Sequence, residues 1–229
     1  MSVRANMEIL RMRIDRAAAR VERNADEITI VAVAKTFPTT SIEEAIACGV
    51  RIIGENRVQE ASQKHAIIGD KVDWHMVGHL QSNKVKDALR IFSIIQSLDS
   101  LRLAQEIEKR AARKIDCLIE VNTSRERTKF GLSPDEVLDF YGNISKFKNI
   151  DVQGLMTIGP GWAVEDPEAS RVCFRLLREL QEELSQEFDR PFPILSMGMT
   201  SDFEVAIEEG STMIRIGIAI FGSRKQSVT

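Results

Sequence analysis

Eight short apolar runs recur along the chain, and a segment with helical character separates each run from the next. The runs lie at 28–34, 50–53, 72–77, 91–96, 115–121, 152–158, 194–196 and 213–216. Strands that alternate with helices pair in parallel through right-handed crossovers. Eight such units in a chain of 229 residues favour a closed barrel over an open doubly wound sheet. The sequence therefore predicts an α/β fold, a (β/α)8 TIM-like barrel.

An extra helix is expected before the first strand. Apolar residues recur there at alternating spacings of four and three, which places them on one stripe of a helix. They are Val3, Met7, Leu10, Ile14, Ala17 and Val21. Such a stripe serves either as a dimer seam or as a face that docks on the helix's own domain, and we expect the second. Because no linker-like composition interrupts the pattern, we expect one domain over residues 1–229.

The charge and cysteine content exclude several classes of protein. The chain has 31 basic and 34 acidic residues, well interleaved, for a net charge of −3, which is unlike the concentrated basic surface of a nucleic-acid-binding protein. No apolar run reaches the length of a membrane span, and no signal peptide is recognisable. Cys48, Cys117 and Cys173 are far apart, so we expect free thiols and a cytoplasmic location.

The first strand ends in a lysine. Alternation along a strand places Val31, Val33 and Lys35 on one face and Ala32 and Ala34 on the other. The ordinary interpretation of Lys35 is an ammonium that snorkels to solvent at the strand edge. The alternative is a desolvated amine with a lowered pKa, which can form a Schiff base with a carbonyl compound.

The segments after the seventh and eighth runs favour the second interpretation. Phosphate sites of (β/α)8 barrels commonly lie there. Gly198 allows close approach of the backbone, hydroxyls lie nearby, and Ser201 with Glu204 has capping-box spacing for a helix start. Arg215 and Gly217 follow the last run. An ordinary helix cap explains the first segment alone, but two such segments at adjacent strand ends favour a phosphate site.

A lysine opposite a phosphate site suits a ligand that carries both an aldehyde and a phosphate. Pyridoxal 5′-phosphate (PLP) is such a ligand. A phosphosugar aldolase, in which Lys35 attacks the substrate carbonyl directly, remains an alternative.

Long motifs along almost the whole chain resemble those of the pyridoxal phosphate homeostasis proteins, which are single-domain relatives of the N-terminal barrel of alanine racemase. The motifs are VAVAKT (31–36), GENRVQE (54–60), WHMVGHLQSNK (74–84), GLM (154–156), LSMGMTSD (195–202), GSTMIRIG (210–217) and FGSR (221–224). No departure from the family pattern is seen at the core positions.

The resemblance implies a role for each matching residue. Lys35 would hold PLP as a Schiff base, Asn56 would line the ring pocket, and Arg215 would face the pyridine nitrogen. The phosphate would be held by Ser196, Met199 and Thr200, with the backbone around Arg215, Ile216 and Gly217. A guanidinium keeps its proton in a protein, so it would leave the ring nitrogen unprotonated and make the cofactor a poor electron sink.

These features favour a PLP carrier in vitamin B6 homeostasis over an enzyme. The alternatives are a slow PLP-dependent amino-acid racemase or another PLP enzyme of the same fold type. Alanine racemases use a tyrosine from a second domain as the opposing acid/base, whereas the only tyrosine here, Tyr141, is expected to pack on a helix. His75 and His79 straddle Gly78 and lack a third ligand, so we expect no metal site.

The remaining expectations concern partners and the surroundings of the pocket. PLP-dependent apoenzymes are the expected recipients, neither nucleic acid nor a membrane is an expected partner, and a monomer is favoured. The segment around Trp162 and the loop 123–129 are expected to cover the pocket.

Overall fold

A computed structural model describes residues 2–222, which form eight parallel strands in a closed barrel. Each strand pairs with the next in the chain, and β8 pairs with β1 to close the barrel. The strands are β1 (Thr29–Val33), β2 (Ile52–Glu55), β3 (Asp73–Met76), β4 (Ile94–Leu98), β5 (Ile115–Glu120), β6 (Ile150–Met156), β7 (Ile194–Ser196) and β8 (Met213–Ile216). The predicted (β/α)8 fold is confirmed. The end of the FGSR motif, residues 223–224, lies outside the described residues.

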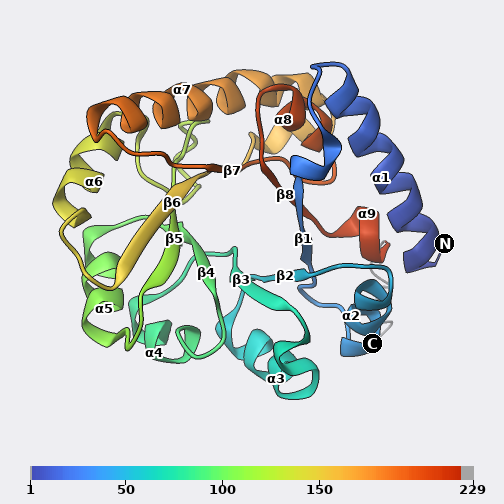
Figure 1. Cartoon of the computed structure of the whole chain (residues 1–229), viewed down its shortest axis with the longest axis horizontal. Helices are drawn as coiled ribbons and strands as arrows, with labels where there is room; N and C mark the ends of the chain where they lie inside the picture. Colours follow the sequence, from blue (N-terminus) through green and yellow to red (C-terminus); the bar gives the residue numbers. More distant parts are fainter. Residues whose placement is uncertain (1, 223–229) are drawn as a thin grey trace.

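Helices surround the strands (Figure 1). They are α1 (Val3–Ala19), α2 (Thr39–Ala47), α3 (Val58–Ile68), α4 (Val85–Ala88), α5 (Leu101–Arg110), α6 (Val137–Ile144), α7 (Arg171–Glu187), α8 (Phe203–Glu208) and α9 (Ile218–Phe221). Short 3-10 turns lie between them: η1 (Ala25–Glu27), η2 (Gly69–Lys71), η3 (Ser82–Lys84), η4 (Pro134–Glu136), η5 (Gly161–Val164) and η6 (Pro167–Ser170).

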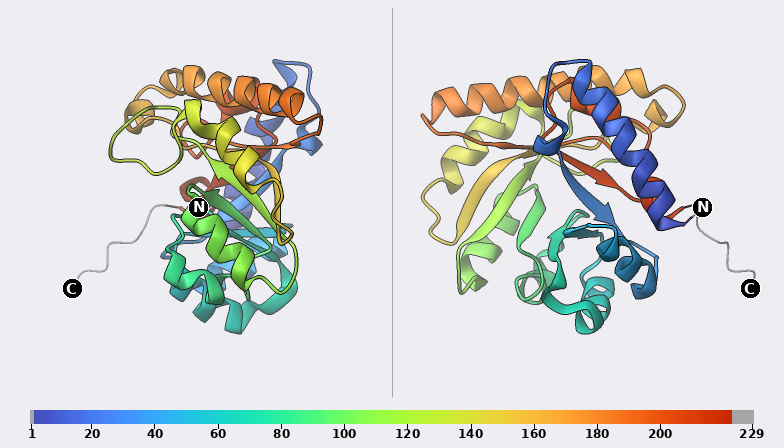
Figure 2. Two further views of the ribbon diagram at one scale, coloured as in Figure 1. Left: turned by 90° about the vertical axis from the view of Figure 1, so that its left-hand side faces the viewer. Right: turned by 45° about the vertical axis from the view of Figure 1, so that its right-hand side comes forward.

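The extra N-terminal helix docks on its own barrel, as expected. α1 packs against α2, α8 and α9 and crosses the outside of the barrel diagonally (Figure 2). Five of the six stripe residues are buried in this contact, whereas Val21 lies beyond the helix end and is exposed. Two polar contacts anchor the helix: Arg13 pairs with Glu204 at 3.1 Å, and Asn6 donates to the carbonyl of Ile220 at 2.9 Å.

β2 and β4 begin two and three residues later than the apolar pattern predicted, because the first residues of each apolar run complete the end of the preceding helix. The amide of Val50 donates to the Ala45 carbonyl at 3.0 Å and so completes the end of α2. Ile91 and Phe92 donate to the Ala88 carbonyl at 3.0 and 2.9 Å and complete the end of α4. Apolar residues at such positions belong to the core without belonging to a strand, which is why hydrophobicity alone misplaces the boundary.

The alternation predicted for the first strand is confirmed. Val31 and Val33 pack in a small cluster inside the barrel with Val77 and Met213. Ala32 and Ala34 face outward into the larger core between strands and helices. The apolar cluster inside the barrel is small because buried polar side chains also occupy the interior: His75, Gln96, Glu120, Ser196 and Arg215.

Two further findings concern the class of protein. Within residues 2–222, no helix combines the length and the apolar character that a membrane span needs. Cys48, Cys117 and Cys173 are free thiols, and the last two are buried.

The packing of β6 on β7 depends on a glycine. Gly154 pairs with Ile194, and a Cβ at Gly154 would overlap the backbone carbonyl oxygen of Ile194.

Gly154→Ala should therefore lower the free energy of unfolding by about 3 kcal/mol or more, or prevent folding, because strand backbone has little freedom to move. Gly142→Ala is the control: Gly142 lies in α6, and the nearest atom to its Cβ would be 3.7 Å away. This change should stabilise the protein by about 0.5–1 kcal/mol. Urea unfolding measures both, and equal midpoints would contradict the proposed close contact.

Candidate functional site

A cavity of about 350 Å³ lies at the C-terminal ends of the strands. We call it the Lys35 cavity. Its lining comes from β1 and β8 and from the segments that follow β1, β2, β3, β6, β7 and β8. The lining residues are Val33, Lys35, Phe37, Asn56, Val77, Ile158, Val164, Met199, Thr200, Ser201, Arg215, Gly217 and Ile218. Of the eight residues predicted to bind a cofactor, six line this one cavity; Ser196 and Ile216 do not.

Lys35 enters the cavity because of the register of β1. The strand ends at Val33, and Lys35 continues the inward-facing series of Val31 and Val33. The lysine is half-buried, and the next residue, Thr36, has a φ of +68°. A positive φ is uncommon for a residue other than glycine, so the chain turns sharply just after the lysine.

The segment between β7 and α8 forms the opposite wall. Gly198 has a φ of +94°, and a Cβ there would lie 2.6 Å from the Cβ of Ala206 and 2.9 Å from the Cα of Phe203. Asp202 is buried and holds the segment from inside: it accepts hydrogen bonds from the Met199 amide at 2.7 Å and the Ser170 hydroxyl at 2.7 Å. The main-chain amides of Thr200 and Ser201 are not used in hydrogen bonds within residues 2–222.

The capping box expected at Ser201 and Glu204 is wrong. α8 begins at Phe203 with Asp202 at its N-cap position, one residue later than the spacing requires. Glu204 instead pairs with Arg13 of α1. Its carboxylate therefore points to the outer helix layer, and Ser201 stays at the cavity.

Arg215 is held from two sides inside the barrel. One guanidinium nitrogen donates to the Ser196 hydroxyl at 2.8 Å and the other to the Thr157 carbonyl at 2.7 Å. Burial lowers the pKa of Arg215 to about 10, so it is still protonated at neutral pH. Ser196 in turn donates to Gln96 at 2.6 Å, and the Gln96 amide nitrogen lies 2.9 Å from Nδ1 of His75. Burial lowers the pKa of His75 to about 4, so this imidazole is neutral and accepts the hydrogen bond.

The structure shows where the side chains of two further predicted residues, Ser196 and Ile216, point. The Ser196 hydroxyl is fully buried and bonded to Gln96 and Arg215, so it supports the arginine and does not face the cavity. The side chain of Ile216 packs in the outer core, while Arg215 and Gly217 on either side of it line the cavity. Met199 does line the cavity, but its amide is bonded to Asp202. Sequence could not assign the direction of the Ser196 hydroxyl, because it depends on Gln96, which is 100 residues away.

Asn56 follows β2 and brings an unsatisfied polar atom to the cavity. Its Oδ1 is buried and has no hydrogen-bond partner within the described part of the chain. A buried polar group without a partner is costly, and a ligand donor or an ordered water commonly satisfies it.

The covering segments are tied together above the cavity. Lys129 donates to the Gly159 carbonyl and pairs with Glu126, both at 2.6 Å, and Glu126 accepts the Gly161 amide at 3.3 Å. Val164 of η5 lines the cavity, whereas Trp162 is 59% exposed. The loop 123–129 thus braces the η5 segment and is not itself part of the lining.

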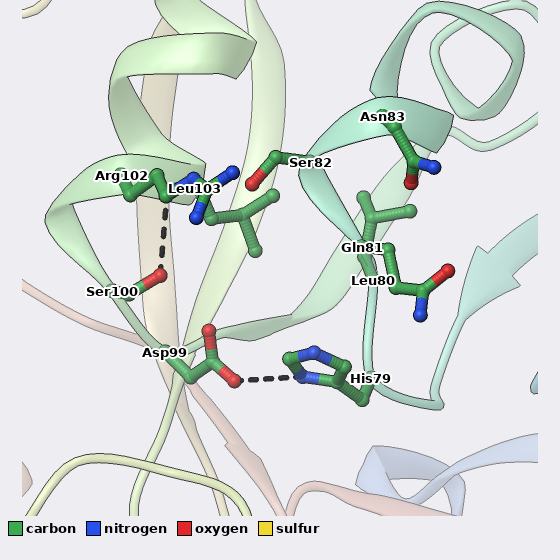
Figure 3. A pocket seen from close by; sticks show the side chains of 9 residues that line it. All are labelled: His79, Leu80, Gln81, Ser82, Asn83, Asp99, Ser100, Arg102 and Leu103. Atoms are coloured by element: carbon green, nitrogen blue, oxygen red, sulfur yellow. Dashed lines mark hydrogen bonds and ion pairs between the residues drawn. The ribbon is translucent and has the colours of Figure 1, made fainter.

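A second, more polar hollow of about 460 Å³ lies beside the barrel mouth, between the loop after β3 and the start of α5 (Figure 3). His79 and Asp99 face each other across its edge, with Nδ1 of the histidine 2.9 Å from a carboxylate oxygen. The imidazole also stacks on Phe130 at a centroid distance of 4.0 Å. This contact joins the loop after β5 to the ends of β3 and β4.

Glu120, at the end of β5, is a buried carboxyl in the same region. Its Oε2 has no hydrogen-bond partner within residues 2–222. Burial, with a further contribution from Asp99, raises the pKa of Glu120 to about 7, although Arg215 opposes the change. At neutral pH this group is therefore partly protonated.

Comparison with known proteins identifies the family. The family model described as "Alanine racemase, N-terminal domain" matches residues 3–225. A protein of Aquifex aeolicus named pyridoxal phosphate homeostasis protein is 44% identical over 217 residues, which cover 93% of this chain and 94% of that protein. The chain belongs to the pyridoxal phosphate homeostasis protein family. The resemblance predicted from the motifs is confirmed.

Two solved structures place this family among known folds. The PipY protein of Synechococcus elongatus, solved with PLP bound, matches with a TM-score of 0.79 and 32% identity over 92% of this chain and 100% of that one. Alanine racemase of Clostridium difficile matches with a TM-score of 0.76 and covers 99% of this chain and 58% of its own. At 16% identity, the second likeness concerns the fold alone.

The raised pKa of Glu120 predicts a pH-dependent stability. Below pH 4.5 the carboxyl is protonated in both the folded and unfolded states; between pH 4.5 and about 7 it ionises mainly in the unfolded state. Stability therefore falls as pH rises through this window, by about 3 kcal/mol in total. Glu120→Gln lacks this loss and should be about 2–3 kcal/mol more stable than the native protein at pH 8, with little difference at pH 4.5. Denaturant unfolding at both pH values measures it; a difference that does not change with pH would contradict the assignment.

Proposed function

We propose that this protein binds PLP in the Lys35 cavity and acts as a carrier that takes up, buffers and delivers the cofactor. One observation carries the proposal: a single cavity brings together the Lys35 amine, the Arg215 guanidinium and the unbonded amides of the β7–α8 segment. An amine, a ring-nitrogen donor and an anion site are what PLP binding requires. The PLP-bound PipY structure, at 32% identity, supports the same conclusion.

The residues present fit the cofactor in size and chemistry. The cavity volume of about 350 Å³ lies in the range of about 300–1,000 Å³ found for small-ligand sites. The Thr200 and Ser201 amides can donate to a phosphate, and the Thr200 hydroxyl lies beside them, 3.4 Å from the amide of Ala219. The buried Oδ1 of Asn56 can accept a hydrogen bond from a ligand.

The proposed roles follow from these positions. Lys35 would hold PLP through its amine, and the chemistry that PLP would supply there is an aldehyde able to form a Schiff base with release of water. Thr200, Ser201 and Gly217 bind the phosphate with a hydroxyl and backbone amides, and Met199 contributes an apolar wall. Ser196 acts indirectly, because its hydroxyl orients Arg215.

Arg215 favours a carrier over an enzyme. Its guanidinium keeps its proton at neutral pH, so it would act as a donor toward a ring nitrogen and would leave that nitrogen unprotonated. An unprotonated pyridine ring withdraws electrons weakly and gives little stabilisation to a substrate carbanion. Tyr141 does not line the cavity: it is buried against Phe188 and Phe192, and its hydroxyl accepts from Arg190 at 3.0 Å.

The wider setting follows from the same proposal. We infer that PLP-dependent apoenzymes receive the cofactor, and that residues 1–229 act as one domain, monomeric and cytoplasmic. The closed barrel and its docked N-terminal helix support the single domain. The free thiols support a reducing compartment. The exposed apolar side chains of Trp162, Val164 and Ile218 beside the cavity support an approach of a recipient protein from this side.

Borohydride trapping tests the Lys35 assignment. After addition of PLP and borohydride, peptide mapping should find a phosphopyridoxyl group on the peptide that contains Lys35. Lys35→Met should abolish this adduct and the visible absorbance, because the methionine has similar length but no amine. Lys71→Met, at an exposed lysine of η2, is the control and should behave like the native protein. Labelling spread evenly over surface lysines would refute the assignment.

Two hydroxyl deletions distinguish phosphate binding from support of Arg215. Thr200→Val should weaken inorganic phosphate binding by about 1–2 kcal/mol, since it removes a donor to the anion. Ser196→Ala should leave phosphate affinity unchanged but alter the absorption spectrum of bound PLP, since it removes the Arg215 acceptor. Calorimetry with phosphate and absorbance spectra with PLP measure the two effects. The opposite pattern would restore Ser196 as a phosphate ligand.

A further inference from the structure

Both peptide groups that flank Lys35 are bound by side chains of α3. The Ala34 carbonyl, on the N-terminal side, accepts from Nζ of Lys64 at 2.7 Å. The Thr36 amide, on the C-terminal side, donates to a carboxylate oxygen of Glu60 at 2.6 Å. Lys64 and Glu60 also pair with each other at 2.7 Å. One ion pair on one helix therefore holds the backbone on each side of the lysine that lines the cavity.

Lys64 is built into the core, whereas Glu60 lies at its edge with 25% of its side chain exposed. The side chain of Lys64 is 9% exposed, and that of Glu55, its second partner at 2.7 Å, is 0% exposed. Lys64 occupies a position in the buried stripe of α3, between Ala61 and Ile68. A lysine there costs desolvation unless its donors are satisfied, and all three of its partners are acceptors at hydrogen-bond distance: Ala34, Glu55 and Glu60.

The backbone held by this pair is strained. Thr36 has a φ of +68°, a conformation that is unfavourable for a residue other than glycine and persists only where surrounding contacts enforce it. The hydrogen bond from the Thr36 amide to Glu60 is such a contact. Without it, the turn after Lys35 would be free to relax and redirect the lysine.

We propose that Lys64 and Glu60 are positioning residues that aim the Lys35 amine at the carbonyl carbon of the ligand. They do so by fixing the two peptide groups around Lys35, and they do not touch the ligand, because neither lines the cavity. This inference rests on the proposed PLP binding and adds to it a mechanism for amine orientation. The sequence pattern that accompanies this positioning pair is a lysine on the buried stripe of a helix, Lys64 between Ala61 and Ile68.

The test separates covalent capture from non-covalent binding. PLP reports both, whereas pyridoxine 5′-phosphate has the same ring and phosphate but no aldehyde, so it reports non-covalent binding only. Glu60→Ala removes the acceptor of the Thr36 amide, and Glu60→Gln keeps an acceptor oxygen. Lys64→Met is combined with Glu55→Gln, because burial already raises the pKa of Glu55 to about 7 and a lone carboxylate would destabilise the core. Gln63→Ala, at an exposed position of α3, is the matched control.

We expect two variants to capture PLP more slowly: Glu60→Ala and the Lys64→Met, Glu55→Gln double variant. In both, the visible absorbance that follows mixing with PLP should appear at least about tenfold more slowly. Small misplacements of a reacting group lower rates by this order. Glu60→Gln should recover most of the rate. Affinity for pyridoxine 5′-phosphate should be unchanged in every variant, and Gln63→Ala should match the native protein in both measurements.

Three results would overturn the proposal. Native capture rates in both disrupted variants would show that the pair does not aim Lys35. Parallel loss of capture and of pyridoxine 5′-phosphate affinity would show a merely structural role. If the native protein itself forms no borohydride-stable adduct on Lys35, the proposed function fails together with this inference. If the native protein forms the adduct and the variants capture PLP at the native rate, only the positioning role fails.

Discussion

The pairing of β8 with β1 is the constraint on which the rest of the structure depends. Parallel strands in a closed ring present all their C-terminal ends at one mouth. Residues far apart in sequence, Lys35 after the first strand and Arg215 in the last, thereby line one cavity. The register of this pairing, with Val31 opposite Arg215, sets the two side chains on the same inward face. A shift of one residue would turn one of them into the outer core.

The barrel interior combines a small apolar cluster with a series of buried polar side chains. These polar side chains lie next to one another because each needs a hydrogen-bond partner. Buried polar side chains cost free energy unless they are hydrogen-bonded. His75, Gln96, Ser196 and Arg215 satisfy one another in series. Fully connected networks of this kind are rigid, so Arg215 meets a ligand in a fixed orientation. Two of the buried atoms that stay unsatisfied within residues 2–222 lie at the barrel mouth: Oδ1 of Asn56, just after β2, and Oε2 of Glu120, at the end of β5.

Much of the fold could be predicted from sequence, because strand and helix periodicities are local properties. The same holds for Lys35, whose face is set by Val31 and Val33 beside it, and for the segment at Gly198. Side-chain direction within the site could not be predicted. Ser196 finds its partner Gln96 at a separation of 100 residues, and Lys64 finds Ala34 at 30. A register shift between β4 and β5 also breaks the alternation that would have placed Gln96 and Asp99. Contacts of this kind arise only from the closed barrel.

The order of the chain has a consequence for synthesis. Arg215, Gly217 and Ile218 belong to the last strand and the helix after it, and α9 is in turn held by Asn6 of the first helix. A ribosome-bound chain that still lacks these residues has Lys35 but neither the arginine nor the final wall of the cavity. An aldehyde captured by the lysine of such a nascent chain would lack the Arg215 guanidinium and the Gly217 wall, although Thr200 and Ser201 could already be present. The cavity is thus complete only when β8 has paired with β1 and α1 has docked on α9.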